Sequence, residues 1–411
     1  MSIFLKDIAS DKLVTWDLFI DDINSALTYN PYCKSNDYYN VFQQIALSLI
    51  IGEEIILLDS DFTDSELINL TGYSEHEEFL RPIDKKKVPL IRDKGEFIEK
   101  LHKAPESWSI TLFTSGTTGT PKKVSHNFHT ISRFVKISKR NTKSIWGFAY
   151  NPTHMAGIQV FFQALLNGNS IIRLFGLNTT RIQNEIKNTN ITHISATPTF
   201  YRLLLPYAET FRSVVRITSG GEKFNNKTKI QLEEIFPNAK ITNVYASTEA
   251  GTLFASENDI FIIKPEYECL IRVENGELLI HNSLMGSSSM SVSEWYNTGD
   301  LVDIVVEKPL KFRFVSRKGD MINVGGYKVN PLEVEETILT LPGIKNARVY
   351  SKSNSVLGNI VCCELVRDNE QLNEVSIRTF LQSKIQEFKI PRIIRFVDEL
   401  STTRTGKIKR N

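Results

Sequence analysis

The chain has 411 residues, and its hydrophobic fraction of 41% excludes a disordered protein and predicts a large folded domain with a smaller one beside it. Its 49 Lys and Arg nearly balance 47 Asp and Glu, so a formal charge of +2 gives no case for a nucleic-acid or membrane surface. Four cysteines without metal-binding spacing, and an N-terminus without a signal-peptide pattern, predict a cytoplasmic protein with reduced thiols.

The first half of the chain alternates short apolar runs with segments of helical spacing. We expect strands at 55–59, 109–114, 170–175 and 192–197 and helices at 158–166 and 199–205. This alternation predicts an α/β fold with a largely parallel sheet. The longest apolar stretch, residues 45–58, is interrupted by Glu53 and Glu54, which favours buried helix or strand over a membrane span.

From about Phe261 the pattern changes to shorter β-rich pieces, with a hairpin predicted at Asn275-Gly276. Near Arg317 it changes again. Pro331 is placed to begin a helix that runs to residue 341. Beyond it we expect strands at 347–353 and 359–366, a helix at 375–387 and a last strand at 393–400. The chain is thus divided into residues 1–317, a large domain of α/β subdomains with a β-rich section, and residues 318–411, a small mobile α+β domain.

A loop rich in Ser, Thr and Gly follows the strand predicted at 109–114. Glycines let backbone N–H groups approach a polyphosphate closely, hydroxyls add donors, and Lys122 supplies a mobile cation. An ordinary flexible turn has the same composition, and no G-x-x-x-x-G-K-[ST] pattern of a P-loop is present. The candidate phosphate-binding residues are Thr114, Ser115, Gly116, Thr117, Thr118, Gly119 and Lys122.

The order T-S-G-T-T-G-T-P-K-K resembles the signature of the adenylate-forming superfamily of acyl- and aryl-CoA synthetases, nonribosomal-peptide adenylation domains and firefly luciferase. Further motifs of that superfamily follow in order between residues 111 and 410. The resemblance implies an enzyme that uses ATP and Mg²⁺ to convert a carboxylic acid into acyl-AMP, releasing pyrophosphate. It also implies transfer of the acyl group to a thiol and a small domain that rotates between the two half-reactions.

Residue by residue, the resemblance places adenine beside two glycines and a tyrosine, since bare glycines and an aromatic ring can sandwich a purine. The adenine-binding candidates are Gly220, Gly221, Glu222, Tyr245 and Ala246. Thr248 and Glu249 match the pair that contacts phosphate and Mg²⁺, for which carboxylate oxygen is a suitable ligand. Asp300 and Arg317 match the ribose-contacting residues, and a carboxylate can accept from both hydroxyls.

The C-terminal segment TTRTGKI resembles the superfamily's catalytic-lysine segment and makes Lys407 the predicted catalytic residue. A solvated basic tail is the alternative that its composition alone would favour. The resemblance also places the hinge at Gly319, where the superfamily usually has Asp or Lys. The predicted thiol tunnel is lined by Gly325, Gly326, Tyr327 and Lys328.

The predicted acid pocket contains Asn151, His154 and Gly157, within a stretch from 150 to 157 that has no acidic residue. Burying an ammonium without a counter-charge is costly, which favours an aryl or short acyl acid over an α-amino acid. The segment GGEKF at 220–224, however, is more like carrier-loading adenylation domains. CoA is the favoured acceptor and a carrier-protein phosphopantetheine the alternative; the oligomeric state is expected to be monomer or homodimer. A non-catalytic nucleotide-binding relative also stays open, because Lys123 and Gly319 depart from the usual pattern.

Overall fold

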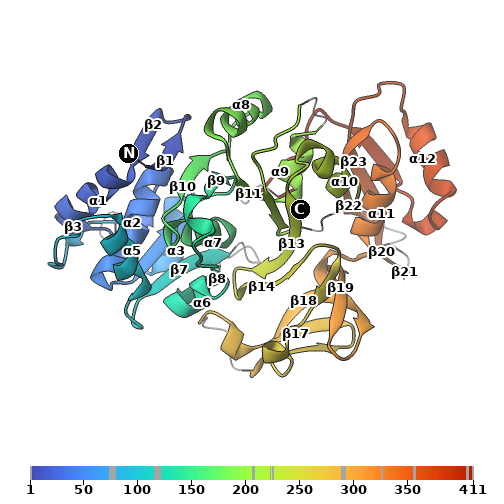
Figure 1. Ribbon diagram of the computed structural model, residues 1–411. Helices are drawn as coiled ribbons and strands as arrows, with labels where there is room; N and C mark the ends of the chain where they lie inside the picture. The colour runs from blue at the N-terminus through green and yellow to red at the C-terminus, as the bar shows by residue number, and fades with distance from the viewer. Residues whose placement is uncertain are drawn as a thin grey trace.

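The computed structural model describes residues 2–73, 80–114, 122–205, 209–222, 224, 226–287, 293–324, 327–354, 358–403 and 407–409. Figure 1 shows the N-terminal elements at one side, a β-rich lobe below the centre, and the C-terminal elements at the other side. The predicted combination of a large α/β domain and a small C-terminal α+β unit is confirmed. No helix in the described ranges is long and apolar enough to span a membrane.

The centre of the large domain is an eight-stranded sheet in which the six inner strands run parallel and both edge strands run antiparallel to their neighbours. The predicted parallel sheet is therefore present. In spatial order its strands are β14 (Gly251–Ser256), β13 (Lys240–Ser247), β12 (Arg216–Gly220), β11 (His193–Ala196), β9 (Ile145–Phe148), β10 (Ser170–Arg173), β1 (Ile3–Asp7) and β2 (Lys12–Thr15).

A four-stranded sheet lies beside it, in the order β4 (Tyr32–Lys34), β5 (Ile55–Leu58), β7 (Ser109–Thr114) and β8 (Lys122–Asn127). A two-stranded sheet pairs β3 (Thr28–Tyr29) with β6 (Ile83–Asp84). The helices of this part are α1 (Trp16–Ser25), α2 (Tyr38–Ile51), α3 (Asp64–Thr71), α5 (Lys94–His102), α6 (Phe128–Ser132), α7 (Met155–Leu165), α8 (Thr179–Thr189), α9 (Pro198–Leu203) and α10 (Asn226–Ile235).

Helix α2 accounts for most of the long apolar stretch. Asp37 caps its N-terminus by accepting from Tyr39 N, and Gly52 ends it in the left-handed conformation with φ of 74°. Buried residues cover nearly all of its surface, because α2 packs inside the core shared by the N-terminal elements. The apolar stretch was expected to form buried helix or strand. It forms both, because it contains the end of α2 and, after the turn that follows, strand β5.

The β-rich lobe is a five-stranded antiparallel sheet. Its strands are, in spatial order, β15 (Ile260–Ile262), β19 (Lys311–Arg317), β18 (Trp295–Val306), β17 (Glu277–His281) and β16 (Ile271–Glu274). The predicted hairpin joins β16 and β17, with Asn275 at φ 51° and Gly276 at φ 77°. Both positive angles explain why this dipeptide favours the turn.

The C-terminal elements pack around a hydrophobic cluster of their own, formed by residues between Ile322 and Phe396. The elements are β20 (Ile322–Val324), β21 (Tyr327–Val329), α11 (Pro331–Leu339), β22 (Ile344–Asn354), β23 (Gly358–Arg367), α12 (Glu374–Gln382) and β24 (Ile393–Phe396). Helix α12 is shorter than expected, since it ends at Gln382 rather than near 387. Ser383 Oγ donates to the Phe380 carbonyl at 2.7 Å, a local bond that competes with continuation of the helix.

His193 at the start of β11 gives the fold a predicted pH dependence. Its ring packs 4.8 Å from that of Trp146, and burial, with Arg216 nearby, lowers the pKa of His193 to about 4. As pH falls below about 6.5, the unfolded chain takes up a proton that the native His193 resists, so the free energy of unfolding should fall until pH approaches 4. Urea unfolding between pH 7.5 and 4 measures this loss. His193→Gln should reduce it, whereas replacing the exposed His129 should not; equal slopes in all three proteins would contradict the prediction.

Candidate active site

The carboxyl ends of β12 and β13 bring two predicted nucleotide-binding segments together. The strands are parallel neighbours, with Gly220 opposite Val244, so the segments that follow them lie side by side. A Cβ on Gly220 would lie 2.5 Å from Val244 Cγ2, so this glycine allows the close approach. Gly221 has φ of +84°, and a Cβ there would lie 2.8 Å from Lys407 Cε. Glycine at 221 thus allows both the backbone turn and the contact with the C-terminal lysine.

Asp300 is the buried centre of the second cluster. It is 3% exposed, accepts from Tyr245 Oη at 2.5 Å, and accepts from Arg317 Nε at 2.8 Å. Asp300 and Arg317 are cross-strand partners on β18 and β19. Burial and the Asp300 carboxylate raise the pKa of Tyr245, so its hydroxyl stays a donor. Burial by itself would lower the pKa of Arg317, but Asp300 raises it, so the guanidinium stays charged.

The predicted metal-contacting pair lies in the turn after β13. His126 Nε2 lies 2.8 Å from the Thr248 carbonyl oxygen, and Gly286 N donates to the Glu249 carbonyl at 2.7 Å. These contacts fix the backbone and leave the Glu249 side chain half-buried. Within the described ranges no three His, Cys, Asp or Glu side chains form a ready metal cage. One carboxylate nevertheless suits Mg²⁺, which usually takes its other ligands from waters and substrate phosphates.

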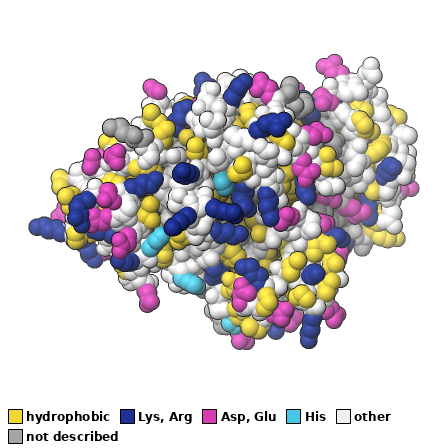
Figure 2. All heavy atoms as spheres, viewed as in Figure 1, with side chains coloured by type: hydrophobic (Ala, Val, Ile, Leu, Met, Phe, Trp, Pro, Cys, Tyr) yellow, Lys and Arg dark blue, Asp and Glu magenta, His cyan; other side chains and the backbone are white. Residues whose placement is uncertain are grey.

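Lys407 extends from the C-terminal tail into this region. It lies against Gly221, and the charged groups that affect it most are Glu222, Arg317, Asp300 and Glu249. Burial lowers the pKa of Lys407, and Arg317 lowers it further, while the three carboxylates oppose the change. The structure therefore brings the predicted catalytic lysine to the predicted nucleotide site. Figure 2 shows Lys and Arg side chains gathered near the middle of the visible face.

Glu277 was not identified from the sequence. It is buried, accepts from Gly299 N at 3.0 Å through one carboxylate oxygen, and pairs with Lys318 Nζ at 3.1 Å through the other. It thereby supports the turn before Asp300 and the residue before the predicted hinge. Gly319 itself has an ordinary φ, and a Cβ there would meet nothing within 4 Å. In this arrangement position 319 does not require glycine.

The predicted acid pocket contains a carboxylate–imidazole contact that the local sequence did not reveal. Asp59, directly after β5, lies with Oδ1 2.9 Å and Oδ2 3.0 Å from His154 Nε2. Thr153 Oγ1 also donates to Asp59, at 2.5 Å, and Thr153 N donates to Asn151 Oδ1 at 2.9 Å. The stretch from 150 to 157 has no acidic residue, but the fold places a buried carboxylate beside it. The only available signal was an aspartate directly after a buried strand.

Some predicted residues are not tested by this geometry. Ser115, Gly116, Thr117, Thr118, Gly119, Gly325 and Gly326 lie outside the described residues. Thr114 ends β7, opposite Lys122 at the start of β8. Ala246 pairs with Thr252 in the sheet. Tyr327 and Lys328 are exposed on β21, where the Tyr327 ring stacks on Phe388 at 4.7 Å.

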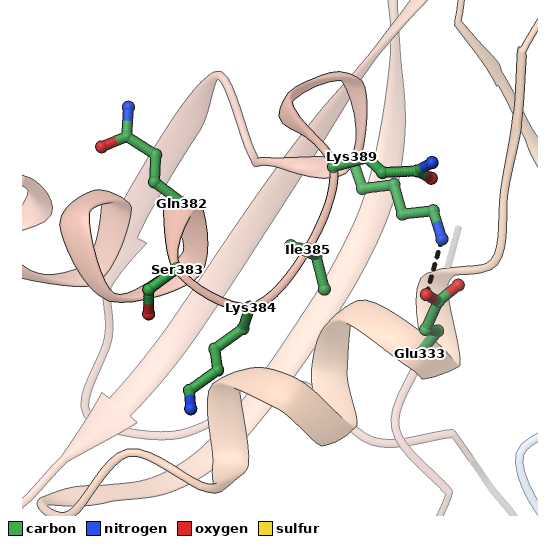
Figure 3. A pocket seen from close by; sticks show the side chains of 7 residues that line it. Glu333, Gln382, Ser383, Lys384, Ile385 and Lys389 are labelled. Atoms are coloured by element: carbon green, nitrogen blue, oxygen red, sulfur yellow. Dashed lines mark hydrogen bonds and ion pairs between the residues drawn. The ribbon is translucent and has the colours of Figure 1, made fainter.

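A separate hollow lies on the small domain, between α11 and the turn after α12 (Figure 3). Its volume is about 360 Å³, and Lys389 Nζ forms an ion pair with Glu333 at its side, at 2.6 Å. Figure 3 shows Lys384 and Ile385 on the facing turn. None of the predicted site residues lines it. It is therefore distinct from the site around Asp300 and Lys407.

The fold and the clustered motifs define an AMP-forming enzyme in two parts, with a large nucleotide-binding part and a small part that supplies a lysine. Residues 41–273 match the family of AMP-binding enzymes, and residues 333–407 match the AMP-binding enzyme C-terminal domain. The chain belongs to the AMP-binding enzyme family.

The chain is similar to several acid–CoA ligases. It is 25% identical to the 2-succinylbenzoate–CoA ligase of Staphylococcus aureus over 95% of this chain and 84% of that protein. It is 26% identical to 4-hydroxybutyrate–CoA ligase 1 of Metallosphaera sedula, over 82% and 67% respectively. An o-succinylbenzoate CoA synthetase (MenE) from Bacillus subtilis, in complex with its acyl-adenylate, has a TM-score of 0.72 at 18% identity, covering 99% of this chain and 94% of that one. ATP-bound MatB from Rhodopseudomonas palustris has a TM-score of 0.74 at 16% identity, with the same coverage.

The glycine at 157 provides a test of the acid-pocket geometry. A Cβ there would lie 2.2 Å from the Asn151 carbonyl oxygen, a backbone atom. Gly157→Ala must therefore displace the segment that carries His154, at a cost of about 1–3 kcal/mol in the free energy of unfolding. Chemical denaturation measures it. Gly319→Ala, at a site with open space, is the control and should change stability by less than about 0.5 kcal/mol. Equal stability of both variants would contradict the described contact.

Proposed function

We propose that this chain activates an aryl or short acyl carboxylic acid as its acyl-adenylate and then transfers the acyl group to CoA. The observation that carries the proposal is the position of Lys407 beside Gly221, among the carboxylates of Glu222, Asp300 and Glu249. A cation held there would reduce the repulsion between the acid's carboxylate and the α-phosphate of ATP, which must approach each other for the reaction. The similarity to acid–CoA ligases favours CoA as the acceptor.

In the first half-reaction a carboxylate oxygen of the acid attacks the α-phosphorus of ATP, and pyrophosphate leaves. Bringing a carboxylate to a phosphate is electrostatically unfavourable, and a fixed cation that contacts both lowers the barrier. Lys407 is the group we assign to this role. Asp300 is suited to accept from the ribose hydroxyls, with Tyr245 and Arg317 holding its carboxylate in place. Glu249 is the proposed protein ligand of Mg²⁺, whose charge would offset that of the phosphates.

For the second half-reaction we propose that the small domain rotates about residues 318–320, so that residues 1–317 and 318–411 act as two domains. The separate core of the C-terminal elements supports this division. Open space around Gly319 leaves the backbone free to change there. Rotation would withdraw Lys407 and bring the segment from 325 to 328 toward the acyl-adenylate.

The acid is proposed from the pocket around His154. Asp59 lies beside this stretch, but its Oδ1 already accepts from Thr153, and its carboxylate lies beside His154 Nε2. A substrate ammonium would have to displace one of these contacts. A neutral aryl or acyl chain requires no such change, which supports the proposed acid class.

ATP–pyrophosphate exchange with a panel of aryl, fatty and amino acids tests the proposal. We expect exchange with one or more aryl or short acyl acids, and formation of the corresponding acyl-CoA when CoA is added, measured by mass spectrometry. Exchange with a single amino acid alone would overturn the acid class. Binding of ATP without exchange for any acid would overturn the function. Acyl transfer to a holo-carrier protein but not to CoA would favour the carrier-loading alternative suggested by Glu222.

The pH dependence of ATP–pyrophosphate exchange should report the protonation state of Lys407. Because burial lowers its pKa from the ordinary 10.5, the ammonium is lost at a lower pH than that of an exposed lysine, and the rate should fall as pH rises toward that value. Lys407→Arg keeps its charge, so its slower exchange should lack this alkaline fall. Lys407→Ala should lose about 100-fold or more in rate at pH 7.5. An unchanged alkaline fall in the arginine variant would assign the titration to another group.

A further inference from the structure

Glu222 makes contacts that adenine binding does not explain. Its side chain is 16% exposed, and its two carboxylate oxygens have different partners. Oε2 accepts from Thr199 N at 3.1 Å and from Thr199 Oγ1 at 2.7 Å, and it lies 3.5 Å from Arg202 Nη2. Oε1 accepts from Ile408 N at 3.0 Å. One oxygen is thus fixed to helix α9 of the large domain, and the other holds the C-terminal tail.

The bonds described for residues 407–409 show how the tail is held. The bonds described for Lys407 and Lys409 stay within the tail: Thr403 N donates to the Lys407 carbonyl, and Lys409 N donates to the Ser401 carbonyl. The bond from Ile408 N is the one, among those described for residues 407–409, that reaches the large domain. Since Lys407 precedes Ile408 and lies against Gly221, a shift of the Ile408 amide would shift the lysine as well.

We propose that Glu222 is a positioning residue that latches the C-terminal tail to the large domain and so places Lys407 for adenylation. The inference rests on the proposed two-step function. The contact joins the two domains directly, so rotation for the second half-reaction must break it. Glu222 would therefore favour the arrangement for the first step and contribute nothing to the second once the tail has left. Arg202 and Thr199 serve to aim the carboxylate, because they occupy its other oxygen.

Two variants of Glu222 separate the loss of its hydrogen-bond acceptor from the loss of its negative charge. Glu222→Ala removes both, whereas Glu222→Gln keeps an acceptor oxygen for the Ile408 amide. Hydrogen bonds to charged groups are strong enough that losing one should slow pyrophosphate exchange by about 10- to 100-fold in Glu222→Ala, with a smaller loss in Glu222→Gln. Acyl-CoA formation from isolated acyl-adenylate and CoA should fall by a clearly smaller factor than pyrophosphate exchange in both variants, because the tail has already left Glu222 in that step. Glu257→Ala, which removes an exposed carboxylate paired with Lys240, is the control and should leave both rates unchanged.

A double-mutant cycle tests the contact itself. Ile408→Pro removes the donor N–H and leaves Glu222 in place. If the latch is the shared cause, Glu222→Ala combined with Ile408→Pro should lose no more exchange activity than the more impaired single variant. Additive losses would overturn the proposal. Equal losses in both half-reactions, with a lowered melting temperature, would show a structural role instead.

Hydrogen exchange provides a readout that does not depend on the acid. With MgATP alone, the C-terminal peptide that contains Ile408 should exchange faster in Glu222→Ala than in the wild-type chain, and Glu222→Gln should fall between them. Unchanged hydrogen exchange at this peptide in Glu222→Ala would overturn the latch, whatever the enzyme's activity. Faster hydrogen exchange in Glu222→Ala, together with no pyrophosphate exchange by the wild-type chain for any panel acid, would uphold the contact and refute the proposed function. The two failures are therefore distinguishable.

Discussion

A half-buried lysine at the contact between the large domain and the C-terminal tail connects the residues of the candidate active site. Lys407 lies against Gly221, and a Cβ at that position would be 2.8 Å from its Cε. Removing an ammonium from water is costly, which is why burial lowers its pKa, and nearby carboxylates must offset part of that cost. Glu222, Asp300 and Glu249 come from three separate segments, so the lysine's position depends on the order of the central sheet and on the β-rich lobe.

Two of these three carboxylates are themselves held by other side chains. Asp300 is fixed between Tyr245 and Arg317, and Glu222 by α9. Such support limits the motion of the carboxylates around the Lys407 ammonium, so they need not reorient as solvent would. The small domain, by contrast, has its own core and donates one lysine through a short tail. This division would let the proposed rotation of the small domain withdraw Lys407 while the residues around Asp300 keep their contacts.

The predicted acid pocket depends instead on a contact between two residues that are distant in the chain. Asp59 and His154 lie 95 positions apart in the chain and meet because β5 and the segment before α7 end near one another. Their mutual contact occupies the Asp59 carboxylate, which could otherwise attract an ammonium. The arrangement supports an uncharged acyl or aryl substrate more strongly than the absence of acidic residues in the local stretch could.

The sequence by itself determined the class of enzyme, because the order of its motifs matches that of the adenylate-forming superfamily. Local patterns also predicted strands β10 and β11 of the central sheet, β5 and β7 of the four-stranded sheet, and the hairpin at Asn275-Gly276, since period, length and turn chemistry are properties of neighbouring residues. Tertiary structure alone decided the strand order, in which β9 lies between β10 and β11, and with it the partners of Asp59, Glu222 and Glu277. Those contacts join residues far apart in the chain, and no local periodicity encodes where a carboxylate finds its donors.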